Sequence, residues 1–158
     1  SIIAWSISNR NDNALVLDTF NQAINQNPDA HPLFHSDRGF QYTSPVFQNK
    51  LKAQGMTQSM SRVACCLDNG PMEGLWGIIK TEMYKMYDIH NKESLIEAID
   101  KYIEFYNYQR YQSRFDSKTP MEVREEAINK EEPKHYPIVF NPRIAKYKES
   151  LKIKTQSA

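Results

Sequence analysis

Hydrophobic residues recur along the chain at two spacings, one typical of strands and one typical of helices. Alternation and β-forming side chains predict strands over residues 1–8, 32–35 and 56–62. Helical spacing predicts helices over residues 13–26, 45–54, 70–87 and 91–108, and Thr119 caps a further short helix. Because strands and helices alternate, the pattern predicts an α/β layer fold.

The most extensive apolar stripe lies in the helix expected over residues 70–87. Its apolar residues are Met72, Leu75, Trp76, Ile79, Met83 and Met86. This helical spacing predicts that Trp76 is buried in the core and that Glu73 lies on the polar side of the helix.

The composition narrows the class of protein. With 158 residues, the chain is long enough for one domain with its own core. Hydrophobic residues make up 40% and charged residues 25%, values typical of a folded globular domain. No apolar run approaches the roughly 20 residues of a membrane span, so we expect a cytoplasmic protein. The adjacent Cys65 and Cys66 lack the spacing of metal ligands and are expected to be reduced.

The charge balance gives no overall sign of nucleic-acid binding. The formal net charge is +1, so any contact with DNA would be local. Residues 129–158 carry seven basic and three acidic side chains. We therefore expect a globular part over residues 1–128 and a basic tail over residues 129–158. The tail could be flexible, and it could contact phosphate or be a solvated basic end.

Two carboxylates have positions that suit chemistry. Asp37 follows the strand expected over residues 32–35, and Glu73 lies in the first turn of the helix that begins at residue 70, with 35 residues between them. The spacing alone is a weak signal, because 19 acidic residues give many such pairs. Two-metal phosphodiester transfer, however, needs hard oxygen ligands on rigid elements, which carboxylates at a strand end and on a facing helix supply.

The residues around these carboxylates form four blocks in a fixed order. They are His35-Ser36-Asp37-Arg38-Gly39-Phe40-Gln41-Tyr42-Thr43-Ser44, Ser59-Met60-Ser61-Arg62, Asp68-Asn69-Gly70-Pro71-Met72-Glu73 and Leu75-Trp76-Gly77-Ile78-Ile79-Lys80-Thr81-Glu82. This string closely resembles the OrfB-type transposases of the insertion-sequence-three family, the DDE type of the retroviral integrase catalytic core superfamily. The resemblance runs from Trp5 to Val123, about 120 of the 158 residues.

The resemblance implies an α/β, RNase H-like integrase catalytic core. It also implies metal-dependent cleavage and strand transfer of transposon DNA ends, with two Mg²⁺ (or Mn²⁺) ions as cofactor. Asp37 matches the second catalytic, metal-binding carboxylate of the family and Glu73 matches the third. The implied partners are transposon ends and target DNA, with a homo-oligomer as the complete enzyme and no membrane.

Basic residues near the two carboxylates are candidates for contact with DNA. Lys80 lies seven residues after Glu73 and shares its helix face, so Lys80 could bind a backbone phosphate or be solvated. Arg38 and Arg62 could also hold phosphate, and each is a weak candidate.

Two further residues could support the site from behind. His35 precedes Asp37 by two residues and so shares its strand face. It could orient the carboxylate or be a packed, neutral histidine. Asn69 could orient the site or cap the helix that carries Glu73.

The sequence also departs from the family pattern. The family's first catalytic Asp, on the first strand of the fold, has no counterpart among these residues. With two of the three carboxylates, we expect weak metal binding, an N-terminally truncated core with an open sheet edge, and an inactive remnant of the enzyme. A non-catalytic DNA-binding or assembly module is the alternative, and a metal-dependent ribonuclease of the same superfold is a third possibility.

Overall fold

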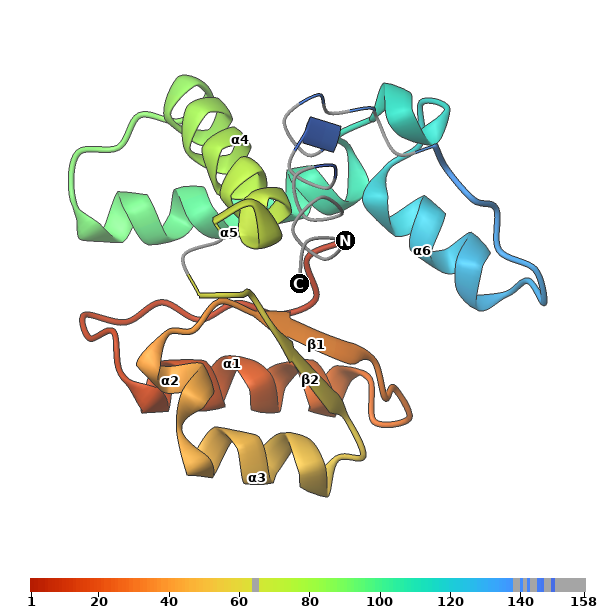
Figure 1. Ribbon diagram of the computed structural model, residues 1–158. Helices are drawn as coiled ribbons and strands as arrows, with labels where there is room; N and C mark the ends of the chain where they lie inside the picture. The colour runs from red at the N-terminus through yellow and green to blue at the C-terminus, as the bar shows by residue number, and fades with distance from the viewer. Residues whose placement is uncertain (64–65, 138–139, 141, 143–144, 147–148, 150–158) are drawn as a thin grey trace. The chain divides into compact units, whose positions relative to one another are not determined.

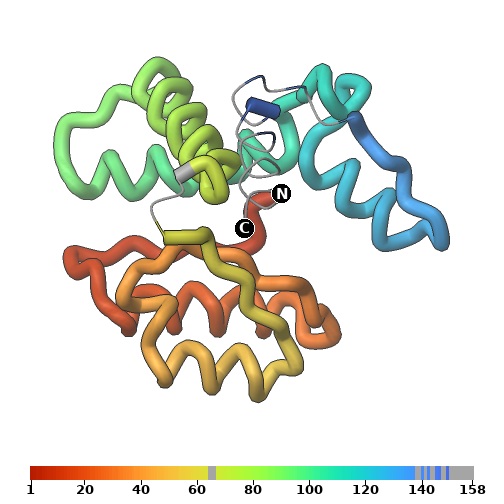
Figure 2. Tube along the Cα trace, in the orientation of Figure 1, coloured from red at the N-terminus to blue at the C-terminus, as the bar shows by residue number. Residues whose placement is uncertain are grey.

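Figure 1 shows a computed structural model of the chain, which describes residues 1–63, 66–137, 140, 142, 145–146 and 149. The chain divides into two compact units, Ser1–Gln109 and Arg110–Ala158. Figure 2 shows the Cα trace of the described residues in the same orientation. Each unit is built from its own elements.

The first unit contains two strands and five helices, with a short 3-10 helix before α4. They are α1 (Asn13–Gln26), β1 (Leu33–Ser36), α2 (Phe40–Thr43), α3 (Pro45–Ala53), β2 (Thr57–Met60), η1 (Cys66–Asn69), α4 (Gly70–Met86) and α5 (Lys92–Tyr108). The predicted helices and the two later strands are confirmed to within a few residues. The four-residue α2 was not predicted, because a single turn leaves no periodic pattern.

The two strands pair in parallel, with Leu33 opposite Thr57 and Ser36 opposite Met60. A parallel pair needs a crossover connection, and α2 and α3 supply it. Local sequence sets the limits of α3, because the Ser44 hydroxyl accepts the backbone N–H of Phe47 at its start. Gly55 follows its end with a positive φ of 65°.

Aromatic side chains form the core beneath the strands. Phe34 of β1 meets Phe20 of α1 edge-on at 6.0 Å between ring centroids, and Phe47 of α3 lies 5.2 Å from Phe34. Phe47 and Leu51 are each only 1% exposed. Figure 1 shows α1 and α3 on the same side of the strand pair, where this cluster lies.

A second core joins α4 to α5. Ile79 and Met83 of α4 are buried against Ala98, Tyr102 and Tyr106 of α5. Tyr102 is fully buried, and its hydroxyl donates to Glu82 Oε2 at 2.7 Å, so its polar atom remains satisfied. The helix that carries Glu73 is therefore held by α5 along its middle.

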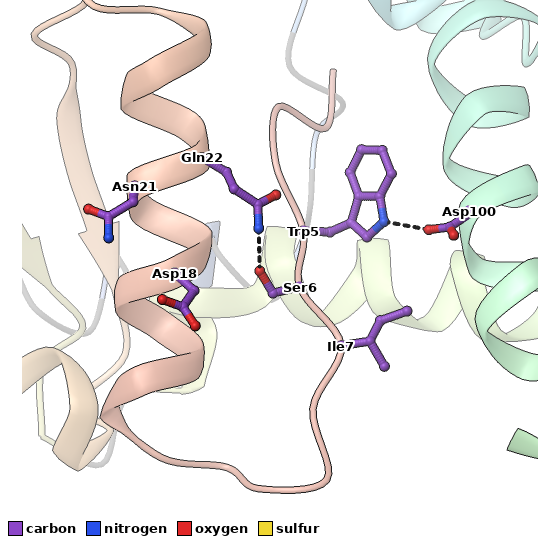
Figure 3. Close-up of a pocket in the computed structure, with 7 residues that line it drawn as sticks. All are labelled: Trp5, Ser6, Ile7, Asp18, Asn21, Gln22 and Asp100. Carbon is purple, nitrogen blue, oxygen red and sulfur yellow. Dashed lines mark hydrogen bonds between the residues drawn. The ribbon is translucent and has the colours of Figure 1, made fainter. Parts of the chain in front are cut away.

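The strand predicted over residues 1–8 is absent, and this prediction was wrong. The segment is extended, but no described strand lies beside it to complete a backbone ladder. Side chains hold it instead: Asn107 accepts the N–H of Ile2 and donates to its carbonyl, each at 2.8 Å. Figure 3 shows the following residues of this segment, where Trp5 Nε1 donates to Asp100 of α5 and Gln22 of α1 donates to Ser6.

The prediction that Trp76 belongs to the core was also wrong. Its side chain is 55% exposed, and the neighbouring Met72 is 46% exposed. Both residues face a groove rather than a packed element, so the apolar stripe of α4 is wider than the surface that α5 covers.

The second unit contains η2 (Ser113–Phe115) and α6 (Pro120–Ile128). A capping box closes the start of α6: the Thr119 hydroxyl accepts the N–H of Glu122, whose carboxylate accepts the N–H of Thr119. Lys134 pairs with Asp116, and the Tyr136 ring meets the Phe115 ring at 5.1 Å. The first residues after α6 therefore pack back onto the loop that precedes it. The division of the chain at residue 129 stays a prediction.

No helix in the described part of the chain is long and apolar enough to cross a bilayer. Cys65 and the last nine residues of the predicted tail lie outside the described residues.

We expect Phe47→Ala to lower the free energy of unfolding by about 3 to 5 kcal/mol, because it empties space at the centre of the aromatic cluster. Val46→Ala is the matched control, since Val46 is next in sequence and 58% exposed, and its cost should stay within about 0.5 kcal/mol. Urea unfolding followed by circular dichroism measures both. Equal costs would contradict the assignment of the core.

Candidate active site

Asp37 stands immediately after the end of β1. Its Oδ1 accepts the backbone N–H of Gly39 at 2.8 Å, which is the only hydrogen bond of the Asp37 side chain to another described residue. The side chain is exposed, so Oδ2 faces solvent. A Cβ at position 39 would lie 3.0 Å from Asp37 Oδ1 and 3.2 Å from Gln41 Oε1, so glycine allows the close turn around the carboxylate.

Glu73 lies in the first turn of α4. Its side chain is exposed and has no hydrogen-bond or ion-pair partner within the described residues. Gly70 and Pro71 begin the helix, and the unpaired backbone N–H groups of a first turn favour negative charge. The Glu73 carboxylate is therefore available to bind a cation.

The oxygens of these two carboxylates are of the kind that Mg²⁺ and Mn²⁺ prefer. Both carboxylates follow the carboxyl ends of the parallel strands, Asp37 directly after β1 and Glu73 after the loop that leaves β2. Within the described residues, however, no group of three or more His, Cys, Asp or Glu side chains is placed to hold a metal ion. The two carboxylates offer oxygen donors but do not by themselves form a metal site within the described residues.

Arg38 connects the Asp37 loop to the end of β2. Its Nε donates to the carbonyl of Ser61 at 2.9 Å, and the N–H of Ser61 donates to the carbonyl of Ser36 at the same distance. The backbone ladder thus extends one residue beyond the assigned strands. The terminal nitrogens of Arg38 make no further bond to a described residue, and they remain available to an anion.

Arg62 holds Asp68, the second residue before the start of α4. Its Nε and backbone N–H both donate to Asp68 Oδ2 at 2.9 Å, and Nη2 donates to Oδ1 at 2.7 Å. These bonds from Arg62 hold the pKa of the Asp68 carboxyl well below its usual range. No role was predicted for Asp68, although a basic and an acidic residue at the two ends of one loop were a visible signal.

Three other candidates are placed less directly. Lys80 is exposed on α4 and lines an apolar groove, with no acidic partner among the described residues. His35 contacts the hydroxyls of Ser59 and Ser61 through its two ring nitrogens, at 3.0 and 3.4 Å. Asn69 occupies the position before α4, but its side chain makes no capping bond. The roles of these residues at a metal site stay predictions.

The Tyr42 hydroxyl senses the charge of Asp37. Burial raises the pKa of Tyr42 above its ordinary value, and the negative charge of Asp37 raises that pKa further. Tyr42 packs against Phe34 and Phe47, so the aromatic core reaches up to the carboxylate. Its titration therefore reports on the charge at Asp37.

Comparison with known proteins places both carboxylates in one kind of domain. A family model described as Integrase core domain matches residues 1–66, and a second model with the same description matches residues 73–128. Asp37 lies inside the first match, and Glu73 is the first residue of the second.

Two bacterial relatives share this region. InsK for insertion sequence element IS150, from Escherichia coli strain K12, is 39% identical over 124 residues, which are 78% of this chain and 44% of InsK. Transposase InsF for insertion sequence IS3A, from the same strain, is 30% identical over 112 residues, 70% of this chain and 38% of InsF. The chain spans less than half the length of either relative.

A solved structure resembles the fold. It is a simian T-cell lymphotropic virus intasome in complex with PP2A regulatory subunit B56 gamma, determined by cryo-electron microscopy. The TM-score is 0.67 at 17% sequence identity, and the match covers 85% of this chain and 48% of that chain. At this identity the likeness concerns the fold alone.

Replacing Asp37 with Asn should lower the pKa of Tyr42, because it removes a negative charge that disfavours the phenolate. That pKa should still stay above the usual tyrosine value, since burial is the larger cause. Titration of ¹³C-labelled tyrosine rings by NMR measures it. Asp88→Asn, in the loop between α4 and α5, is the control and should leave Tyr42 unchanged. An unchanged Tyr42 in the Asp37 variant would refute the proximity.

Proposed function

Because the chain belongs to the integrase-core family of insertion-sequence transposases, we propose that it supplies part of a polynucleotidyl transferase site that cuts and joins DNA ends. Membership in this family and the integrase-core fold confirm the resemblance found in the sequence. The proposal rests on the exposure of the Asp37 and Glu73 carboxylates. Neither carboxylate is bound by a basic side chain among the described residues.

The contrast with Asp68 supports this assignment. Asp68 lies on the same loop-and-helix connection, but its carboxylate is neutralised by Arg62. A metal-binding carboxylate must have oxygens free of competing cations. Within the described residues, Asp37 and Glu73 meet this requirement, and Asp68 does not.

In the proposed site, Asp37 and Glu73 would each hold a divalent ion. Two Mg²⁺ (or Mn²⁺) ions, when bound, would activate the attacking oxygen and neutralise charge on the leaving oxygen of a phosphodiester. The bond from Gly39 orients Asp37 Oδ1 and leaves Oδ2 for a ligand. Rigid attachment of Glu73 to α4 limits the movement of the second carboxylate.

Basic groups near the carboxylates would position the DNA backbone. We assign Lys80 and the terminal nitrogens of Arg38 to this role, because neither has an acidic partner among the described residues. Contacts of this kind hold phosphates without reading base sequence. We further propose an assembled homo-oligomer on transposon ends and target DNA as the working form, in the bacterial cytoplasm.

A complete site requires more polypeptide than these residues provide. Two pockets of about 750 and 480 Å³ share Trp5 and Trp76 and form an apolar groove. The extended residues 3–6 line it on one side and Phe34 of β1 on another. The backbone of residues 3–8 pairs with no other described backbone, and β1 pairs only with β2 in the described sheet. We propose that strands carrying a further carboxylate complete the sheet here.

Strand transfer by a labelled DNA end in the presence of Mn²⁺ tests the proposed function. The chain alone should be inactive. The chain fused to the segment that precedes the matched region in InsK should join the end to target DNA. Glu73→Ala in the fusion should abolish joining, with a loss of at least about 10³-fold expected for a metal ligand.

Glu93→Ala is the matched control, because Glu93 is also an exposed first-turn glutamate, on α5. It should leave joining unchanged. A folded fusion that binds the DNA end but never joins it would contradict the proposal and favour a non-catalytic DNA-binding or assembly module.

A further inference from the structure

The loop between β2 and α4 is closed by one ion pair. Arg62 lies two residues beyond β2, and Asp68 lies in η1, immediately before α4. Three hydrogen bonds join the two residues, one of them from the backbone N–H of Arg62. The Asp68 side chain is 20% exposed and the Arg62 side chain 51% exposed. The pair is therefore anchored on its acidic side, and the two-nitrogen geometry fixes direction as well as distance.

A continuous series of bonds runs from one carboxylate to the other through this pair. Asp37 is followed by Arg38, whose Nε is bonded to the carbonyl of Ser61. Ser61 is followed by Arg62, which forms an ion pair with Asp68 just before the helix that carries Glu73. No side-chain cap assists at this point, because the Asn69 side chain makes no capping bond.

We propose that Arg62 and Asp68 are positioning residues, which set the start of α4 and so place Glu73 relative to the strand end that bears Asp37. Arg62 then acts on the reaction through α4 and makes no contact with DNA phosphate. The part of this inference that concerns the reaction rests on the proposed function. The part that concerns the start of α4 does not.

If Arg62 instead bound phosphate, Asp68 would compete with that phosphate for the guanidinium. A phosphate that approached the Nε–Nη2 edge of the guanidinium would have to displace a carboxylate that already accepts a hydrogen bond from each of these nitrogens. The depressed pKa of the Asp68 carboxyl agrees with this firm engagement. Neutralising Asp68 would weaken the pair, which would help a phosphate-binding arginine and harm a positioning one.

Asp68→Asn therefore separates the two roles, since it removes a negative charge and no positive one. We would measure amide hydrogen exchange in the chain and strand transfer in the fusion with the InsK segment, each for Asp68→Asn, Arg62→Ala and the exchanged pair Arg62→Asp with Asp68→Arg. Glu97→Gln is the matched control, because Glu97 pairs with Lys101 on α5, away from this loop.

The expected result is faster exchange of the amides of η1 and the first turn of α4 in both single variants, with the amides of α1 and α3 unchanged. Strand transfer should fall about 100-fold in both, as a displacement of about 1 Å can cause. The exchanged pair should recover part of both losses, since it restores an ion pair between positions 62 and 68 without the hydrogen bond from the backbone N–H of residue 62. Glu97→Gln should change neither measurement.

Three outcomes would overturn the inference. In the first, Asp68→Asn binds the DNA end more tightly and joins it as well as the wild type, which assigns Arg62 to phosphate. In the second, exchange at the start of α4 is unchanged in both single variants. In the third, exchange rises but joining is unaffected, so Glu73 does not depend on the pair. A fusion that is inert with the wild-type sequence refutes the proposed function, and the exchange data still decide the role of the pair.

Discussion

The parallel pairing of β1 with β2 is the constraint on which the rest of the first unit depends. Parallel strands deliver their carboxyl ends to the same edge, so Asp37 and the loop toward Glu73 leave the sheet together. Four residue pairs are a short ladder, and the aromatic cluster beneath it supplies stability that the hydrogen bonds lack. Phe34 belongs to both, as a residue of β1 and a member of the cluster.

The acidic residues in this part of the molecule differ in whether a basic side chain binds them. Asp68 accepts three hydrogen bonds from Arg62, and this ion pair joins the two ends of the connection between β2 and α4. The carboxylates of Asp37 and Glu73 are exposed to solvent and have no basic partner among the described residues. Structural ion pairing and ligand binding make incompatible demands on one carboxylate, so only the latter two are candidates for a ligand.

The groove beside the strands is lined by large apolar side chains of the kind found in a protein core, but several of them are exposed. Trp76, Met72 and Tyr84 are exposed along one face of α4, and each lines this groove. Exposed apolar surface of this kind in contact with an unpaired strand edge favours added polypeptide over solvent. The segment at residues 1–8, which also lines this groove, is extended but pairs with no strand in the described part of the chain.

The sequence by itself determined the local elements and singled out two candidate carboxylates. Capping residues and apolar spacing fixed α1, α3, α4, α5 and α6, because those signals act within a few residues of the chain. The spacing of Asp37 and Glu73, with the blocks around them, was enough to indicate the family.

Tertiary structure alone decided what each element meets. Residues 1–8 have a strand pattern but lack a neighbouring strand, and Trp76 has a core pattern but lacks a covering element. Arg62 has the charge to bind DNA, but its partner is Asp68 across a loop. In each case the local sequence predicts the chemical character of the residue. Whether that residue is buried, paired or neutralised depends on distant residues that the fold brings next to it.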